Sequence, residues 1–253
     1  MFIALDENKN RISIENVREE KRYYCPICGK QLIIRAKNSV AIKTHFSHKK
    51  GTDCDNFSHD MSEWHLNWQK QFPEKCREVV VSNGEEKHRA DVLINGSVIE
   101  FQHSPITAEE IARRNRFYTS CGFKVVWVFD ANNNIKNEYG ETLDPAKCGE
   151  FDLCWKRAKR QFVVPMGPSV SVFIQYKTEL SVKGLEGKQV DILLLLRSIE
   201  PKYIKYFSTK IGSRYYYLTP SNFVKEFVDF DKETLRVSSI IGEANKYQKQ
   251  FIR

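Results

Sequence analysis

The stretch that decides the fold is His88-Arg-Ala-Asp-Val-Leu-Ile94, then Asn95-Gly96, then Ser97-Val-Ile-Glu-Phe-Gln102. An Asn-Gly pair between two alternating apolar runs predicts a β-hairpin with a two-residue type I′ turn. Such a turn fixes the register and places Asp91 opposite Glu100. Cross-strand partners on one face have Cβ atoms about 5 Å apart, where two carboxylates repel each other unless a positive group lies between them.

A divalent cation would hold this pair of carboxylates together. Mg²⁺ favours one or two carboxylates together with waters and phosphate oxygens, so the pair indicates metal-assisted cleavage of a phosphodiester. The alternative is an exposed sheet face of mixed charge, with Lys87 and Arg89 as the neighbouring cations, because ion-pair networks resemble functional clusters.

The overall composition favours a protein that binds an anionic partner. The net charge of +8 over 253 residues indicates nucleic acid ahead of a membrane surface. No apolar run approaches the ~18 residues of a membrane span, and no signal peptide is visible. Seven cysteines, of which three are clustered, suit a reducing compartment better than a disulfide scaffold. We therefore expect a cytoplasmic protein without a membrane segment, and DNA as its partner.

A zinc site is predicted in the N-terminal region. Cys25-Pro-Ile-Cys28-Gly29 has the spacing of a zinc knuckle, and His45, His48 and Cys54 follow at a compatible distance. We expect structural Zn²⁺ on the two knuckle cysteines, His48 and Cys54, with His45 as the reserve ligand. In an extended segment the two histidines point to opposite faces, so only one of them binds. The alternative is a chance pair of cysteines beside surface histidines.

The hairpin is flanked by elements that together predict an α/β core. Apolar positions at helical spacing support a first helix, and Thr107 with Glu110 forms a capping box at the start of a second. The expected order is a helix over 60–71, a strand over 78–81, the two hairpin strands, a helix over 107–121 and a strand over 124–129.

Outside this core the expectations are simpler. Strands are predicted at 2–5, 11–14, 170–176, 190–196 and 215–218; helices over 151–162, from Ser221 and over 234–251; a loop over 131–149; and a linker at 165–168.

Several motifs together resemble the competence protein CoiA-like family. They are Cys-Pro-x-Cys-Gly, His-Phe-x-His, Glu63-Trp-His65, His88-Arg-Ala-Asp-Val92, Glu100-Phe-Gln-His-Ser104, Arg114-Asn-Arg-Phe-Tyr118 and Val126-Trp-Val-Phe-Asp130. The resemblance covers about the first 165 residues, and beyond them only Trp155-Lys-Arg157 is similar to the family.

The resemblance implies a three-part α/β (α+β) architecture. A zinc-ribbon-like module over 1–58 would precede a PD-(D/E)xK restriction-endonuclease-like core over 59–165, and a small accessory α+β region over 166–253 would follow. It also implies a Mg²⁺- or Mn²⁺-dependent deoxyribonuclease that serves competence, recombination or defence, with recombination or DNA-uptake proteins as possible partners.

The resemblance also assigns roles to the acidic residues. The carboxylates corresponding to Asp91 and Glu100 hold Mg²⁺ in that fold, and Glu63 supports the site. Gln102 stands where the commonest form of the superfamily has a lysine, so it can position water but cannot stabilise charge. Lys70 or Lys87 is the candidate for that missing role.

Other polar residues are candidates for auxiliary roles, each beside a simpler interpretation. His88 and His103 are expected as rim histidines or proton-transfer groups, and His65 as a packing or orienting residue. Arg114 and Asn115 are expected either to contact phosphates or to form part of a solvated basic face. The rival to the nuclease hypothesis is a catalytically inactive adaptor that keeps the fold and binds DNA or protein.

Overall fold

The computed structural model describes residues 1–18, 20–39, 43–49, 54, 62–104, 106–130, 135–137, 152–155, 169–179, 189–195, 198–203, 206–210, 217–218 and 220–228. For 135–137 and 152–155 only the backbone is described, and beyond residue 175 the side chains are described in part. None of the helices within these ranges is long and apolar enough to cross a bilayer.

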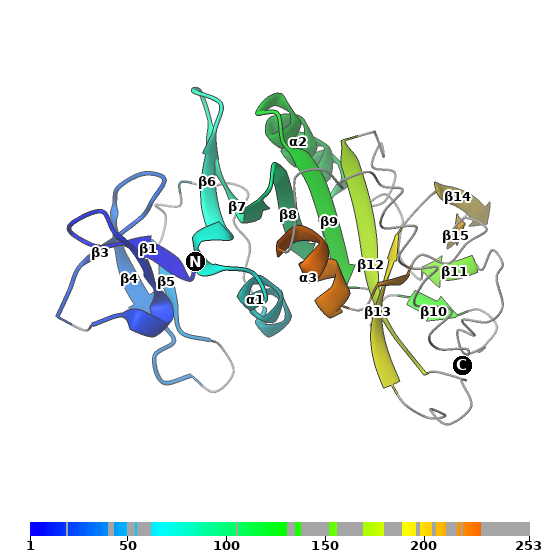
Figure 1. Ribbon diagram of the computed structural model, residues 1–253, viewed down its shortest axis with the longest axis horizontal. Coiled ribbons are helices and arrows are strands. Elements are labelled where there is room, and N and C mark those ends of the chain that lie inside the picture. The colour runs from blue at the N-terminus through cyan, green and yellow to red at the C-terminus, as the bar shows by residue number, and fades with distance from the viewer. Residues whose placement is uncertain are drawn as a thin grey trace.

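A seven-stranded sheet forms the centre of the molecule (Figure 1). Its strand order is β16-β13-β12-β9-β8-β7-β6, and it is covered by α1, α2 and α3. The bounds are α1 (Glu63–Lys70), β6 (Arg77–Ser82), β7 (Lys87–Ile94), β8 (Ser97–Gln102), α2 (Ala108–Ser120), β9 (Lys124–Asp130), β12 (Val170–Glu179), β13 (Gln189–Leu195), β16 (Tyr217–Leu218) and α3 (Pro220–Val228), with a 3-10 turn at Glu74–Cys76. The predicted order of helix, three strands, helix and strand is confirmed over residues 63–130.

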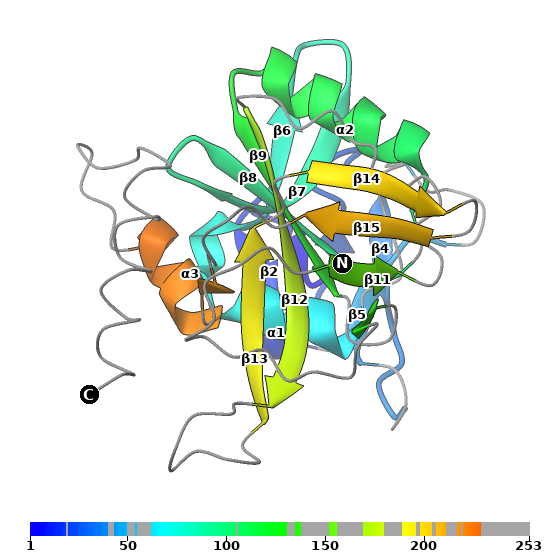
Figure 2. The same cartoon turned by 90° about the vertical axis from the view of Figure 1, so that its right-hand side faces the viewer.

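α1 and α3 cover one face of this sheet, and α2 covers the other (Figure 2). Val126 and Val128 of β9 are buried in one hydrophobic core with side chains of α1 and α3. Successive side chains of a strand alternate between faces, so Trp127 points the other way, where its indole Nε1 donates to Asn115 of α2 at 2.8 Å. The predicted capping box of α2 is confirmed, because the Thr107 hydroxyl accepts the Glu110 amide.

The central hairpin has the predicted turn and register over its paired part. Asn95 and Gly96 have φ of +48° and +73°, which a type I′ turn requires. The ladder contains three pairs, from Ile94 with Ser97 next to the turn to Val92 with Ile99. Asp91 lies just beyond the recorded ladder.

The N-terminal module is a second sheet of order β2-β1-β3-β4-β5. Its elements are β1 (Ile3–Leu5), β2 (Arg11–Ser13), a 3-10 turn (Ile14–Asn16), β3 (Tyr23–Tyr24), β4 (Gln31–Arg35) and β5 (His45–Ser47), so the hairpin predicted at its start is confirmed. The buried carboxylate of Glu78 accepts the amides of Phe2 and Ile3 at 2.9 Å. Glu78 has φ of +46°, a costly conformation for a non-glycine residue, and this contact joins the module to β6.

The C-terminal half differs from prediction in two places. A third sheet of order β10-β11-β15-β14 contains β10 (Ile135–Asn137), β11 (Asp152–Trp155), β14 (Ser198–Tyr203) and β15 (Tyr206–Lys210). The predicted helix over 151–162 is therefore wrong at 152–155, and the predicted loop over 131–149 contains a strand. Both strands gain their conformation from antiparallel partners distant in sequence, and such pairing overrides local propensity.

The strands predicted at 170–176 and 190–196 and the helix near Ser221 are confirmed by β12, β13 and α3. β12 pairs in parallel with β9, and Phe173, Leu193 and Phe223 share one core with Trp68 of α1. The described part of the accessory region thus extends the central sheet. The predicted linker, the helix over 234–251 and both domain boundaries fall outside the described residues.

Candidate active site and metal centre

Asp91 is held at the point where β7 and β8 stop pairing. Its Oδ2 accepts the backbone N–H of Phe101 at 2.9 Å, so a side-chain bond stands where a main-chain bond would have continued the ladder. Its Oδ1 lies 2.9 Å from Nε2 of His65 and accepts Nε2 of Gln69 at 3.3 Å. Both partners are on α1, which therefore fixes the orientation of the carboxylate.

Glu100 lies on β8 on the face covered by α2. It is 1% exposed, and its Oε2 accepts Nη1 of Arg114 at 2.7 Å. Its other oxygen, Oε1, is buried and has no hydrogen-bond partner of good geometry in the described part of the chain; the hydroxyl of Tyr118 is close enough to lower the pKa of this carboxyl. A buried carboxylate oxygen that makes no bond is costly, and it is a ready ligand for a cation.

The two carboxylates influence each other's protonation. Burial raises the pKa of Glu100 to about 7, and the negative charge of Asp91 adds to this rise. The pKa of Asp91 is lowered, because the charge and hydrogen bond of His65, the Phe101 amide and the charge of Arg114 outweigh the opposing effect of burial. Asp91 is therefore negatively charged at neutral pH, whereas Glu100 loses its proton only near pH 7.

A pH effect on stability follows from the raised pKa of Glu100. Between pH ~4.5 and ~7 the folded chain keeps a proton that the unfolded chain releases, so a rise in pH across this window favours unfolding. We expect Glu100→Gln, which carries no charge, to gain stability relative to the natural chain between pH 5 and pH 7.5. Urea unfolding of both proteins without added Mg²⁺ measures this, and a difference of constant size at the two pH values would contradict it.

Glu63, the acidic residue at the start of α1, does not join the pair of Asp91 and Glu100. The side chain of Glu63 is 65% exposed and lies 3.1 Å from the ammonium of Lys43 in the N-terminal module. None of its recorded contacts reaches Asp91 or Glu100. Sequence reasoning missed Gln69, which is 1% exposed and follows His65 by one helical turn, the spacing that brings two side chains to the same face.

Neither candidate for the lysine role contacts the pair. Lys70 forms an ion pair with Glu15 of the N-terminal module, and Lys87 is exposed at the start of β7. Gln102 is 4% exposed, and its amide nitrogen donates to the carbonyl of Ser104 at 2.5 Å. Gln102, which stands where the commonest form of the superfamily has a lysine, is thus hydrogen-bonded to the loop that follows it.

α2 supplies a buried polar stripe behind Glu100. Arg114 is 3% exposed, and its Nε also donates to Glu110 at 2.9 Å. Tyr118 lies one turn further on, fully buried; burial raises the pKa of its hydroxyl, and the charge of Glu100 raises it further. The solvated basic face expected for Arg114 and Asn115 is therefore wrong, since both are buried and Asn115 bonds Trp127.

The two remaining candidate histidines, His88 and His103, make separate contacts. His88 is 6% exposed, and its ring meets that of Phe117 edge-on at 4.5 Å. His103 is partly exposed, and its Nδ1 lies 2.7 Å from Oδ2 of Asp130 on β9.

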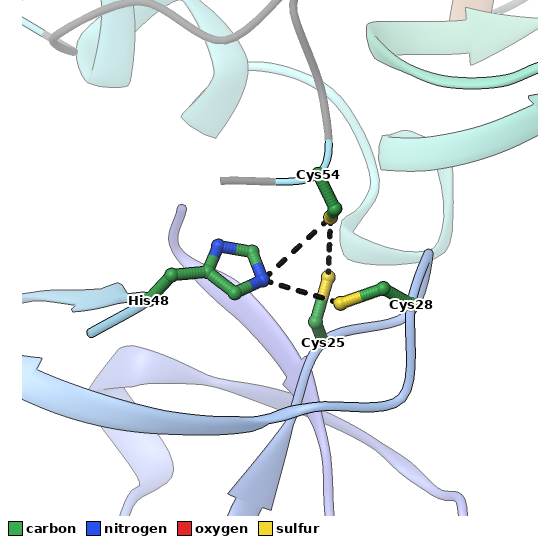
Figure 3. A group of neighbouring side chains, drawn as sticks. All are labelled: Cys25, Cys28, His48 and Cys54. Atoms are coloured by element: carbon green, nitrogen blue, oxygen red, sulfur yellow. Dashed lines mark hydrogen bonds between the residues drawn. The ribbon is translucent and has the colours of Figure 1, made fainter. Parts of the chain in front are cut away.

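The Cys25, Cys28, His48 and Cys54 side chains converge in the N-terminal module (Figure 3). Their ligand atoms all lie within 4.8 Å of one another, which no other set of three or more His, Cys, Asp or Glu does within the residues described. The Sγ atoms of Cys25 and Cys54 are 3.6 Å apart, and Nε2 of His48 lies 3.4 and 3.6 Å from the Sγ atoms of Cys28 and Cys54.

These spacings fit a zinc ion. Tetrahedral bonds of about 2.3 Å to sulfur and 2.0–2.1 Å to nitrogen place sulfurs about 3.8 Å apart and sulfur and nitrogen about 3.6 Å apart. The choice of His48 over the reserve ligand is confirmed, because His45 is turned to the carbonyl of Lys43 at 2.9 Å. Burial raises the pKa of Cys25 and raises that of Cys54 strongly, so a cation is needed to hold both as thiolates.

Comparisons with known protein families agree with both halves of this description. The model of the competence protein CoiA N-terminal domain matches residues 6–57, which include the cysteine–histidine cluster. The model of the competence protein CoiA nuclease-like domain matches residues 66–177, which include Asp91, Glu100 and the start of β12. No significant match to the chain was found among the curated proteins or the solved structures. The two matches cover consecutive parts of one sequence, and the chain belongs to the competence protein CoiA family.

Proposed function

We propose that this chain is a metal-dependent DNA nuclease with a PD-(D/E)xK-type core. The observation that carries the proposal is the pair formed by the half-buried Asp91 and the buried Glu100 where β7 and β8 stop pairing. Glu100 Oε1 has no hydrogen-bond partner of good geometry among the described residues, and the charge of Asp91 helps raise the pKa of Glu100. A divalent cation would offset this repulsion and use the free oxygen. The membership in a family with a nuclease-like domain supports the same assignment.

Asp91 and Glu100 would hold Mg²⁺ or Mn²⁺, which when bound polarises a phosphoryl oxygen and lowers the pKa of a bound water. The residues around them keep the two carboxylates in place. His65, Gln69 and the Phe101 amide orient Asp91. Arg114 orients Glu100 through Oε2 and leaves Oε1 for the ion.

DNA is the substrate that the charge of the chain favours. The net charge of +8 attracts a polyanion, and the phosphodiester is a group whose hydrolysis a carboxylate-held Mg²⁺ would assist. The N-terminal module would carry structural Zn²⁺ on its four protein ligands, which leave no open coordination position for a substrate.

A second candidate is an inactive adaptor that binds DNA or protein through the same fold. The pairing of Arg114 with Glu100 favours it, because a guanidinium partly neutralises one of the two carboxylates. The engagement of Gln102 with Ser104 favours it as well, since neither this amide nor a lysine stands ready to stabilise charge at the site.

One assay separates the two functions. The zinc-loaded protein is incubated with single- and double-stranded DNA, with Mg²⁺, with Mn²⁺ or with no added metal. Fragments that form only when metal is added are the expected result. DNA that is retained on the protein yet uncut under every condition would overturn the nuclease proposal in favour of the adaptor.

A further inference from the structure

The parallel strands β8 and β9 end side by side, next to the middle of the parallel strand β12, with polar residues on the face covered by α1. β8 pairs Gln102 with Phe129 of β9, so His103 follows at the level of Asp130, and Asp130 is paired with Gln175 of β12. The side chains of these last three residues share a face with Phe101, Val128 and Phe173, two residues earlier in each strand. Carboxyl ends of parallel strands are a common place for ligand binding in open α/β sheets.

His103 and Asp130 form an oriented pair at this edge. Nδ1 of His103 lies 2.7 Å from Oδ2 of Asp130, whose side chain is only 8% exposed, while the His103 side chain is 39% exposed. A carboxylate accepts hydrogen bonds and does not donate them, so Nδ1 carries the proton of this bond. The other ring nitrogen, Nε2, is then the one that remains for contact with solvent or a substrate.

The pair is fixed from α1 as well. The indole ring of Trp64 lies 5.8 Å from the ring of His103, and its Nε1 donates to Oε1 of Gln175 at 2.8 Å. Trp68 donates to the same oxygen at 2.7 Å. The exposed histidine is thus held between a buried carboxylate and an indole that the neighbouring strand locks in position, a degree of fixation that a solvent-facing ion pair does not need.

This pair stands close to the carboxylate site along β8. The amide that binds Asp91 belongs to Phe101, two residues and about 7 Å of strand before His103. Both residues are on the face covered by α1, where Trp64 contacts each of their rings. Asp91 is bonded from α1 and by the Phe101 amide, so it takes part in the carboxylate site from the face that also carries His103.

We propose that His103 is the proton donor to the oxygen that leaves the phosphorus, with Asp130 as its positioning residue; this inference rests on the proposed nuclease function. The attacking water forms a bond to phosphorus and gives its proton to solvent. The bond from phosphorus to the leaving sugar oxygen breaks, and the electron pair stays on that oxygen. The oxygen takes the proton from Nε2 of the His103 imidazolium. Solvent later returns a proton to the neutral ring.

The direction of transfer follows from the carboxylate. Asp130 accepts the proton of Nδ1 and so turns Nε2 away from itself, and Nε2 is the atom that donates when the ring carries both protons. The inference also gives the site a charged group that Gln102 does not provide.

The test compares two substrates with the full-length, zinc-loaded protein in Mn²⁺. One is an ordinary DNA strand, and the other has the leaving oxygen, identified from the ends of the products, replaced by sulfur. A thiol has an ordinary pKa of about 8.5, so the thiolate leaves without a proton. The variants are His103→Gln, Asp130→Asn and, as the matched control, His45→Gln, an exposed histidine outside both metal sites.

We expect His103→Gln to cut the ordinary strand about 10²-fold more slowly or worse, and the sulfur strand at close to the natural rate. Asp130→Asn should show the same selective loss in smaller measure, and His45→Gln should cut both strands normally. An equal loss on both strands would assign His103 to substrate positioning and overturn the inference. No loss on either strand would overturn it as well, and would leave His103 and Asp130 as an ion pair at the sheet edge. If the natural chain cuts neither strand, the nuclease proposal itself fails, and the inference fails with it.

Discussion

Replacing Asp91 with asparagine is expected to lower the rate of metal-dependent DNA cleavage by about 10³-fold or more. A catalytic metal contributes several kcal/mol of transition-state stabilisation, and about 4 kcal/mol corresponds to a factor of about 10³. Asparagine has the shape of aspartate and can still accept the Phe101 amide, but it supplies no negative charge to a cation. Initial rates on a labelled DNA strand at saturating Mg²⁺ give the comparison.

The matched control for this change is Glu85→Gln, another replacement of an acid by its amide, in the exposed turn between β6 and β7. It should leave the rate within about twofold of the natural chain, as surface substitutions away from a site do. Thermal unfolding checks that Asp91→Asn keeps the fold. A folded Asp91→Asn protein that cuts DNA at the natural rate would remove Asp91 from the chemistry.

Loss of the zinc site is expected to unfold the N-terminal module. A structural zinc site contributes about 10–16 kcal/mol of apparent binding free energy in small zinc peptides, which is as large as the roughly 5–15 kcal/mol that holds a typical domain folded. The module core contains only a few large side chains, including Phe2, Tyr23 and Phe46. Cys28→Ser should therefore lose the ion and lower the temperature of unfolding by tens of degrees for this part of the chain.

Two controls accompany that experiment. Cys121→Ser changes a cysteine at the end of α2, outside the cluster, and should keep one zinc per chain. His48→Ala should lose the ion, whereas His45→Ala should keep it, because only His48 faces the thiols. Zinc is measured per chain by elemental analysis after desalting. A zinc content in Cys28→Ser equal to that of the natural chain would refute the site.

Hydrogen exchange follows how the loss spreads. The amides of Phe2 and Ile3 are bonded to Glu78 of β6, so they report on whether the module stays attached to the sheet. Their fast exchange in Cys28→Ser is the expected result, with the amides of β8 and β9 still protected.

The central part of the fold could be predicted because its signals are local. The Asn95-Gly96 turn fixes the hairpin through its own backbone preference, and Thr107 sets the start of α2 through a single side-chain bond. The meeting of Cys25 and Cys28 in the cysteine–histidine cluster was predictable for a similar reason, since the knuckle brings them together without help from distant residues. Spacing alone decided these features.

The surroundings of the carboxylates could not be predicted in the same way. The partners of Asp91 on α1 depend on how that helix packs, and the family resemblance pointed to Glu63 as the supporting acid. The structure instead brings His65 and Gln69 to Asp91. A helical stripe of Glu110, Arg114 and Tyr118, at intervals of four residues, was visible in the sequence as one face of α2, but only the sheet behind it shows that this face is buried against Glu100.

The third sheet escaped prediction for a further reason. β11 was predicted as part of a helix, and its partners in β10 and β15 lie about 20 and about 55 residues away along the chain. Pairing at such separation leaves no local trace in composition.

The most direct test of the central claim is the position of a bound cation. Crystals of the zinc-loaded protein are soaked in Mn²⁺, and its anomalous scattering is located. The account predicts a peak between Asp91 and Glu100 within about 2.0–2.2 Å of an oxygen of each, as octahedral coordination of this kind requires. Glu100 still paired only with Arg114, and no peak beside Asp91 at saturating Mn²⁺, would contradict it.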